Sequence, residues 1–446
     1  MRDLTGIVKA YDIRGVVGEQ LNADIAEALG RAAAVELHGE AVVVATDMRP
    51  SGPELAEAFM RGVRAQGVDT VDIGLASTDL LYYASGRLGQ PGAMWTASHN
   101  PARYNGLKLC RAGAEPVSID TGLAAIRDRA QADDFPAASS EGSHSSQQLL
   151  DEYAEHVRSF ADIGALRPLK VAVDAGNGMA GLVVPAVFGD LPVDLVPLYF
   201  ELDGTFPNHP ANPIEPENLR DLQAVVVEQG CDLGLAFDGD ADRMFCVDER
   251  GEPVSPSLIT AVIAKTMLDR SPGSTVLYNL ICSKTVPETV EAAGGHAVRT
   301  RVGHSYIKAV MKETGALFAG EHSGHYYFRD NFRADSGLIA SVILLEALSD
   351  HGGQMSELAA PYDKYSQSGE INTEVSDQQA AMQRVAQQLA GEGEADWTDG
   401  LTFDAHGWWF NLRPSNTEPL LRLNVEADDA ETMAQVRDRV LDLIRS

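Results

Sequence analysis

The sequence has 446 residues, of which 44% are hydrophobic and 22% charged, and its formal net charge is −30 at pH 7. This length exceeds what one hydrophobic core organises, so we expect about three or four domains. The negative charge excludes unspecific binding to nucleic acid, whose phosphates it would repel, and any anion-binding site must gather its few basic side chains locally.

The sequence also lacks the features of a membrane or secreted protein. No apolar run approaches the ~20 residues that span a bilayer, and the opening MRDLTGIVKAYDIRG has no apolar signal-peptide core. We therefore expect a cytoplasmic protein with no membrane partner. The cysteines are scattered and form no CxxC pair, which is typical of reduced core residues rather than zinc ligands or disulfides; they are Cys110, Cys231, Cys246 and Cys282.

Three stretches of the chain share one order of elements: an apolar, β-rich run, a turn, an amphipathic helix and a second run. They begin at 41–46 (AVVVAT), 171–178 (VAVDAGNG) and 274–283 (STVLYNLICS). Strands that alternate with single helices predict βαβ units with parallel or mixed sheets. The tail has short strand-like runs at 370–375 and 420–425 and a closing amphipathic helix, which predicts a smaller α+β domain.

Changes of composition indicate where the domains meet. The polar, Ser-rich stretch 139–148 is the clearest linker, and breaks near 252 and 364 follow changes of pattern. The expected domains are three α/β domains at 1–146, 147–252 and 253–364 and a C-terminal α+β domain at 365–446.

The first loop with chemical potential is TASHNP (96–101), which follows the apolar run PGAMW. Small residues around a hydroxyl, followed by Asn-Pro, predict a strand that ends in an exposed turn and presents Ser98 outward. A serine at a loop tip is usually only solvated. The neighbouring His99 would suit a proton or phosphate partner, but it does not decide between the two interpretations.

The run DGDADR follows the apolar LGLAF. Its alternating carboxylates, Asp238, Asp240 and Asp242, would converge on one side of a turn, where their repulsion favours a hard divalent cation. With Glu249, the spacing also matches a calcium-binding helix-loop-helix, but Arg243 stands where that loop needs glycine and the flanks are strand-like. Three protein oxygens leave room at an octahedral magnesium ion for a phosphate oxygen, so we expect a magnesium site.

Two later loops carry groups that suit a sugar and a phosphate. GEHSGH (320–325) offers a carboxylate, a hydroxyl and imidazole between glycines, although a loop histidine is more often a surface residue. RPSNTEP (413–419), with Arg422 after it, offers an arginine fork, hydroxyl and amide groups and backbone N–H groups for a phosphate dianion. A proline-bounded hairpin loop is the alternative interpretation of RPSNTEP.

Taken in order, these loops resemble the α-D-phosphohexomutase superfamily, most closely its phosphomannomutase/phosphoglucomutase branch. The resemblance spans nearly the whole chain and includes KAYDIRG (9–15), TASHNP with YNGLK (104–108), DGDADR, GEHSGH and RPSNTEP. It implies three related α/β domains with mixed sheets and a smaller C-terminal α+β domain around a central active-site cleft.

The resemblance also implies an isomerase that interconverts mannose 6-phosphate and mannose 1-phosphate, with glucose phosphates as plausible further substrates. The implied route uses a phosphoserine and a hexose 1,6-bisphosphate as intermediate and activator, with Mg²⁺ as cofactor. Phosphoglucosamine mutases carry a similar sugar loop, so they and dedicated phosphoglucomutases remain alternatives. A hexose phosphate is the expected partner, and the chain is expected to be a monomer or a small homo-oligomer.

Matching motifs imply the site residues. Ser98 resembles the phosphoserine and, together with Asp238, Asp240 and Asp242, the magnesium site. The polar residues implied around the transferred group are Arg14, Lys108, Arg243 and His304. Those implied to bind the sugar and the distant phosphate are Glu321, Ser323, His325, Arg413, Ser415, Asn416, Thr417 and Tyr11. A general base is also needed, and the candidates by reach and chemical type are His99, Lys108 and His325.

Two other classes of protein share part of this pattern. A phosphatase would also use a magnesium-bound acidic loop and a phosphoenzyme, but it needs no grip on a second, distant phosphate, which RPSNTEP would supply. A sugar-phosphate binding protein without catalysis would have no use for Ser98 beside an acidic triad.

Overall fold

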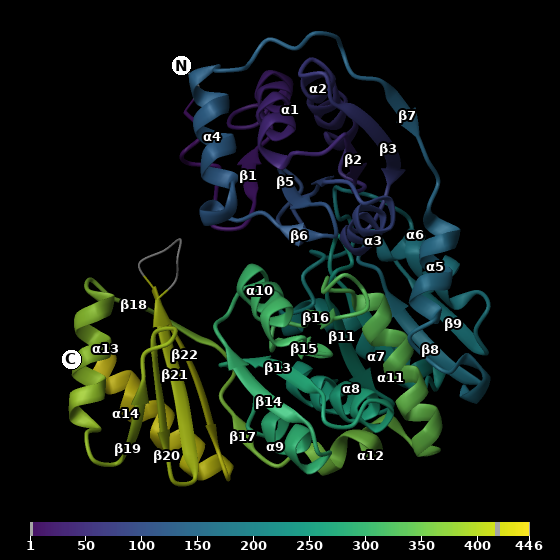
Figure 1. The fold of residues 1–446 in the computed structure, drawn as a ribbon. Coiled ribbons are helices and arrows are strands. Elements are labelled where there is room, and N and C mark those ends of the chain that lie inside the picture. Colours follow the sequence, from purple (N-terminus) through teal and green to yellow (C-terminus); the bar gives the residue numbers. More distant parts are fainter. Residues whose placement is uncertain (1–2, 415–419, 446) are drawn as a thin grey trace.

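The computed structural model describes residues 3–414 and 420–445, which form four sheets in four successive parts of the chain (Figure 1). Helices cover the first three sheets, and the fourth is antiparallel and packs against two helices, so the predicted fold class is confirmed. Within the described residues, no helix has both the length and the apolar character that a bilayer crossing requires.

The first sheet is mixed and has the order β1-β5-β4-β2-β3-β7, with β6 beside β5. Its strands are β1 (Ile13–Val16), β2 (Ala41–Thr46), β3 (Asp69–Leu75), β4 (Gly92–Trp95), β5 (Tyr104–Arg111), β6 (Glu115–Pro116) and β7 (His144–Ser146). Its helices are α1 (Ala23–Leu37), α2 (Gly52–Arg64), α3 (Thr78–Leu88) and α4 (Leu123–Ala132). Val42 and Val44 pack on the side of α1 and α2, and Val43 and Ala45 on the side of α3, which explains why β2 is apolar up to Ala45.

The second sheet has the order β12-β11-β10-β8-β9, in which β10 is parallel to β8 and antiparallel to β11. Its strands are β8 (Leu169–Asp174), β9 (Val193–Leu198), β10 (Leu233–Phe237), β11 (Met244–Asp248) and β12 (Pro253–Val254). Its helices are α5 (Leu150–Arg158), α6 (Ala180–Phe188) and α7 (Arg220–Gln229). The turn from β10 to β11 contains the DGDADR run, so two fully buried strands hold that run at one edge of the sheet.

The third sheet has the order β14-β13-β15-β16. Its strands are β13 (Thr275–Asn279), β14 (His296–Thr300), β15 (Phe318–Gly320) and β16 (Tyr326–Phe328). Its helices are α8 (Pro256–Arg270), α9 (Thr285–Ala292), α10 (His304–Thr314), α11 (Gly337–His351) and α12 (Met355–Ala359). The helix α11 is apolar nearly all round because it is buried on most sides, and Ser336 caps its first turn by accepting from Ile339 N.

The fourth sheet has the order β17-β22-β21-β20-β19, with β18 beside β22. Its strands are β17 (Ser366–Gln367), β18 (Ile371–Glu374), β19 (Gly393–Asp396), β20 (Leu401–Ala405), β21 (Trp408–Pro414) and β22 (Leu420–Ala427), and its helices are α13 (Gln378–Gln388) and α14 (Ala430–Arg445). Four single 3₁₀ turns complete the described elements: Ile119–Thr121, Ile163–Ala165, Pro216–Leu219 and Ala360–Tyr362.

One feature of the linker differs from the prediction. Part of the Ser-rich stretch 139–148 forms β7, which pairs with β3 at the edge of the first sheet, because its backbone groups find partners there despite the polar side chains. We propose the limits 1–146, 147–252, 253–364 and 365–446 for the four domains; β12, which pairs with β11, begins one residue beyond the second limit. All four cysteines are buried and free, as expected.

Candidate active site

The serine loop connects β4 to β5 and lies against the second domain. Ser98 is only 3% exposed, so the prediction of an exposed loop tip was wrong. The reason is that the turn after β10 covers the loop. Ser98 Oγ donates to Asp238 Oδ2 at 2.7 Å, and Arg243 Nη2 lies 3.4 Å from Ser98 Oγ. Ser98 has a φ of 49°, and its N–H donates to Thr96 Oγ1 at 2.9 Å.

The acidic loop brings three carboxylates together. Oxygen atoms of Asp238, Asp240 and Asp242 lie within 4.8 Å of one another, and all three residues are buried. Lys108 Nζ, from β5, donates to Asp240 Oδ2 at 2.6 Å and to Asp242 Oδ2 at 2.7 Å. Thr78 Oγ1, at the start of α3, also donates to Asp240 Oδ2 at 2.6 Å. The first and second domains thus meet at this cluster.

The donor set fits a hard divalent cation. The Oδ1 atoms of Asp240 and Asp242 are buried and, within the described residues, have no hydrogen-bond partner. Burial and the Asp240 carboxylate raise the pKa of Asp242 to about 7, whereas at Asp240 the Lys108 ammonium outweighs the effect of burial and lowers the pKa. This crowding of negative charge is what a bound cation would relieve, and carboxylate oxygen is the ligand that Mg²⁺ prefers.

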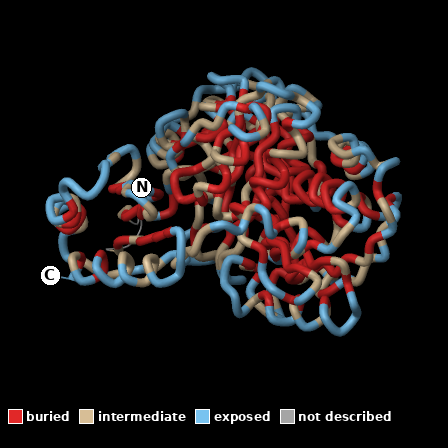
Figure 2. The backbone as a smooth tube through the Cα atoms, turned by 90° about the horizontal axis from the view of Figure 1, so that it is seen from below, coloured by how far each residue is buried: buried red, intermediate tan, exposed pale blue. Residues whose placement is uncertain are grey.

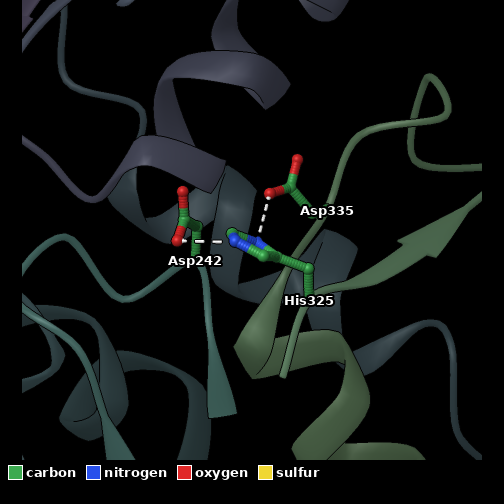
Figure 3. A group of neighbouring side chains, drawn as sticks. All are labelled: Asp242, His325 and Asp335. Carbon is green, nitrogen blue, oxygen red and sulfur yellow. Dashed lines mark hydrogen bonds and ion pairs between the residues drawn. The ribbon is translucent and has the colours of Figure 1, made fainter. Parts of the chain in front are cut away.

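The GEHSGH loop (320–325) between β15 and β16 faces the same cluster. Glu321 is buried and accepts from Asn279 Nδ2 at 3.0 Å and from the Tyr327 hydroxyl. His325 Nδ1 lies 3.0 Å from Asp335 Oδ2 and 3.8 Å from Asp242 Oδ1, so the imidazole lies between two carboxylates (Figure 3). Burial lowers the His325 pKa, but these carboxylates raise it more, and the net shift is upward.

A cavity of about 150 Å³ opens where the first three domains meet. The residues that line it are Tyr11, Asp12, Arg14, Tyr82, Ser98, His99, Lys108, Asp242, Arg243, His304, His325 and Asp335. Burial and the Arg243 guanidinium lower the pKa of His99 well below its usual value, and burial and Lys308 lower that of His304 to about 3. Both imidazoles are therefore neutral at pH 7.

Arg14 and Tyr11 line this cavity and contact neighbouring parts of the chain. Arg14, on β1, donates to Asp12 Oδ2 at 2.8 Å and to the Asn100 side chain of the serine loop. The Tyr11 ring lies edge-on to His304, with 5.0 Å between ring centroids, which joins the first domain to the start of α10.

The structure describes only the first two residues of the RPSNTEP run (413–419). Arg413 is the last residue but one of β21, and its Nη2 donates to Glu370 Oε2 at 3.0 Å, while Arg422 Nη1 lies 3.4 Å from Glu370 Oε1. Arg413 does not line the Ser98 cavity. The predicted phosphate ligands Ser415, Asn416 and Thr417 lie outside the described residues. Ser323 lies half-buried in the sugar loop.

Several cavity residues were missed in the sequence. Tyr82 lies inside α3, and Asp335 follows β16 in a run, FRADSG, that matches none of the motifs considered. Asp12 was within reach of sequence reasoning, because it lies in KAYDIRG between two predicted site residues.

The geometry defines a group-transfer site, in which a buried serine hydroxyl faces a carboxylate cluster suited to a cation and two basic side chains. Comparison with known families gives its class. Successive parts of the chain match the families described as phosphoglucomutase/phosphomannomutase alpha/beta/alpha domain I (residues 5–137), domain II (151–251), domain III (255–365) and C-terminal domain (370–443). The chain belongs to the phosphoglucomutase/phosphomannomutase family.

Individual relatives match over nearly their full length. A phosphomannomutase of Salmonella montevideo is 40% identical over 457 residues, which cover 100% of both chains. A phosphomannomutase/phosphoglucomutase of Pseudomonas aeruginosa is 40% identical over 441 residues, or 97% of this chain and 94% of that one. The crystal structure of a phosphoglucomutase/phosphomannomutase family protein from Burkholderia thailandensis has a TM-score of 0.92 and 34% identity, covering 100% of this chain and 98% of that chain.

Proposed function

We propose that this protein is a phosphomannomutase, an isomerase that interconverts mannose 6-phosphate and mannose 1-phosphate and that also accepts glucose phosphates. The observation that carries the proposal is the contact of Ser98 Oγ with Asp238, at 2.7 Å, in a cavity that also holds Lys108 and Arg243. We further propose a cytoplasmic location, and a monomer or small homo-oligomer as the active form.

In the first transfer, phospho-Ser98 faces the free hydroxyl of a hexose monophosphate. The bond from phosphorus to the Ser98 oxygen breaks while a bond to the sugar oxygen forms, and the sugar proton passes through a base to Ser98 Oγ. His99 and His325 line the cavity and are the candidates for this base. Burial lowers the pKa of Lys108, but the Asp240 and Asp242 carboxylates raise it more, well above its usual value, so this third candidate remains a cation. The proton on Ser98 Oγ then has a ready acceptor in Asp238.

Charge on the transferring group is balanced from several sides. Arg243 donates from its Nε to Asp238 Oδ2 at 2.9 Å, which aims its Nη2 at Ser98 Oγ, and Lys108 adds a second cation. Asp238, Asp240 and a phosphoryl oxygen on Ser98, together with Asp242, would hold Mg²⁺, which when bound neutralises further charge at this point.

The second transfer reverses the first at the other end of the sugar. The hexose 1,6-bisphosphate reorients in the cleft so that its other phosphoryl group faces Ser98. That group is transferred to Ser98 Oγ, and the isomer leaves. We propose that Glu321, Ser323 and His325 bind the sugar hydroxyls in both orientations. Tyr11 and the loop that starts at Arg413 would grip the phosphate that is not reacting, and His304, which lines the Ser98 cavity, would lie beside the transferred group.

Replacing Ser98 tests the proposal. We expect Ser98→Ala to abolish turnover and the incorporation of phosphate from hexose 1,6-bisphosphate, while binding of mannose 1-phosphate by calorimetry stays within a few-fold of wild type. Ser159→Ala is the matched control, because Ser159 is an exposed serine whose hydroxyl donates only to the His156 carbonyl among the described residues. Near-normal turnover of Ser98→Ala with bisphosphate present would refute the phosphoserine role.

Kinetics with three hexose 1-phosphates test which hexose is the preferred substrate. We expect kcat/KM for mannose 1-phosphate to equal or exceed that for glucose 1-phosphate and to exceed that for glucosamine 1-phosphate. A preference for glucosamine 1-phosphate would identify a phosphoglucosamine mutase, and a strong preference for glucose a dedicated phosphoglucomutase. Release of inorganic phosphate in step with substrate consumption would instead indicate a phosphatase.

A further inference from the structure

The residue that shapes the serine loop is a buried arginine outside the predicted site. Arg49 follows β2 and is 1% exposed. Its Nη2 donates to the carbonyl oxygens of Ser98 at 2.8 Å and Asn100 at 2.7 Å. Its Nη1 donates to those of Pro101 at 3.1 Å and Tyr104 at 2.9 Å. One guanidinium group thus binds four backbone carbonyls within seven consecutive residues.

Every donor of this side chain is used. The remaining N–H, on Nε, donates to Asp47 Oδ2 at 3.2 Å, and Asp47 Oδ1 accepts from Arg49 N at 2.9 Å. Asp47 is completely buried and balances the cation, and the Phe206 ring of the second domain covers the guanidinium at 5.2 Å. Because Arg carries five N–H donors in a fixed plane, lysine, with three donors on one atom, cannot reproduce this set.

The loop that Arg49 binds has a strained backbone. Ser98 has a φ of 49°, in the left-handed region that serine rarely adopts, and such a conformation persists only where its surroundings enforce it. The Ser98 carbonyl is confined on a second side, because a Cβ added at Gly239 would lie 2.5 Å from this oxygen. Arg49 Nη2 and the backbone of the acidic loop therefore fix the peptide that follows Ser98.

We infer that Arg49 is a positioning residue, whose fork on the carbonyls of Ser98, Asn100, Pro101 and Tyr104 holds Ser98 Oγ at the acidic loop. The inference rests on the proposed role of Ser98 as phosphoryl carrier. Arg49 acts through the loop backbone, so it sets the rate of phosphoryl transfer rather than the affinity for the sugar phosphate.

The test compares Arg49→Lys with Arg158→Lys. Arg158 is the matched control because its guanidinium also binds carbonyl oxygens, those of Ala186 at 2.8 Å and Val187 at 3.3 Å, and a carboxylate, Asp190, at 3.3 Å, but at the end of α6. Both changes keep the positive charge and remove the planar fork.

We expect Arg49→Lys to lower kcat, and the rate at which bisphosphate phosphorylates Ser98, by about 100-fold, because a displacement near 1 Å costs a transfer reaction about that factor. KM should stay within about threefold, since the sugar-binding loops are untouched. Hydrogen exchange should speed up at the amides of residues 97–105 and not elsewhere. Arg158→Lys should leave kcat and that exchange at wild-type values.

A kcat and local exchange for Arg49→Lys equal to those of Arg158→Lys would overturn the inference, as would a loss that falls on KM alone. If Arg49→Lys does not fold, Phe206→Leu tests the inference instead. The half-buried Phe206 ring covers the Arg49 guanidinium without forming a hydrogen bond to it. Unchanged kcat and unchanged exchange at 97–105 in Phe206→Leu would then refute the role. If wild-type protein carries no phosphate on Ser98, the proposed function fails instead, so the two failures are distinguishable.

Discussion

The first three domains share a hydrophobic core, whereas the C-terminal domain has its own. One hydrophobic core runs through the first three, from Val43 on β2, through Val171 and Val173 on β8, to Leu344 on α11 and Ala359. The C-terminal domain has a separate core, built from residues between 381 and 444. Figure 2 shows buried backbone concentrated in the large body, with the C-terminal domain projecting to one side.

Polar contacts join the two parts. Glu426 accepts from the backbone N–H of Lys284 at 2.9 Å, Lys284 Nζ donates to Asp404 at 2.8 Å, and Val302 N donates to Asp399 at 3.1 Å. The TASHNP, DGDADR and GEHSGH loops thus stand on domains that share one hydrophobic core, whereas Arg413 stands on a domain with a core of its own. The proposed phosphoryl transfer therefore lies in the large body, and the proposed grip on the distant phosphate lies in the domain with the separate core.

The largest expected effect tests whether chemistry resides in the large body. Asp240→Asn should lower kcat by at least about 100-fold and raise the Mg²⁺ concentration needed for half-maximal activity, because it removes a charged oxygen from the buried cluster. Asp438→Asn in α14, a largely exposed carboxylate, is the control and should change neither. A magnesium titration of Asp240→Asn that overlays wild type would contradict the metal site.

Two core truncations test whether the parts unfold separately. Leu344→Ala and Leu423→Ala each remove a fully buried side chain and should each cost about 2–5 kcal/mol of unfolding free energy. Calorimetry should show that Leu344→Ala lowers the transition of the large body and Leu423→Ala that of the C-terminal domain. A single transition that both variants shift equally would mean that the two cores unfold as one.

A pH series tests the junction within the large body. Asp79 is buried where Tyr153 donates to it at 2.5 Å and Ser336 at 2.6 Å, so one carboxylate joins α3, α5 and α11. Burial raises its pKa to about 6, above the unfolded value of 3.8, although hydroxyl donors lower it. Its contribution to stability is therefore fully present below pH 3.8 and is lost as the pH rises through about 6.

Asp79→Asn should remove that dependence. Between pH 4 and 7, wild type should lose on the order of 2 kcal/mol more unfolding free energy than Asp79→Asn, as measured by urea titration. Parallel curves for the two proteins would show that Asp79 does not titrate in this range.

The smallest effect is expected at the polar contact itself. Arg299 pairs with Asp396 across the two parts, and both side chains are 37% exposed. Arg299→Gln should change the unfolding free energy by less than about 1 kcal/mol, because an exposed ion pair contributes little. A larger loss in calorimetry would mean that the parts are held more firmly than the separate cores indicate.

Sequence reasoning found those features that lie in continuous motifs. The DGDADR carboxylates form a compact cluster because one short turn supplies all three, and the βαβ order predicted the mixed sheets. It missed the burial of Ser98, since the covering loop is 140 positions away along the chain. It missed Arg49 and Asp335 for the same reason: their roles come from neighbours in space that no local pattern reveals.

The core shared by three domains also has a consequence for synthesis of the chain. Asp79 and its partner Ser336 are 257 residues apart, so at about 5–20 residues per second the partner leaves the ribosome roughly 13–50 seconds later. During that interval Asp79 lacks the Ser336 hydroxyl at the start of α11, and the core that Leu80 and Leu81 share with the second and third domains is incomplete. The nascent chain therefore exposes apolar surface that the folded protein buries, and such surface is prone to aggregation until the third domain has been made.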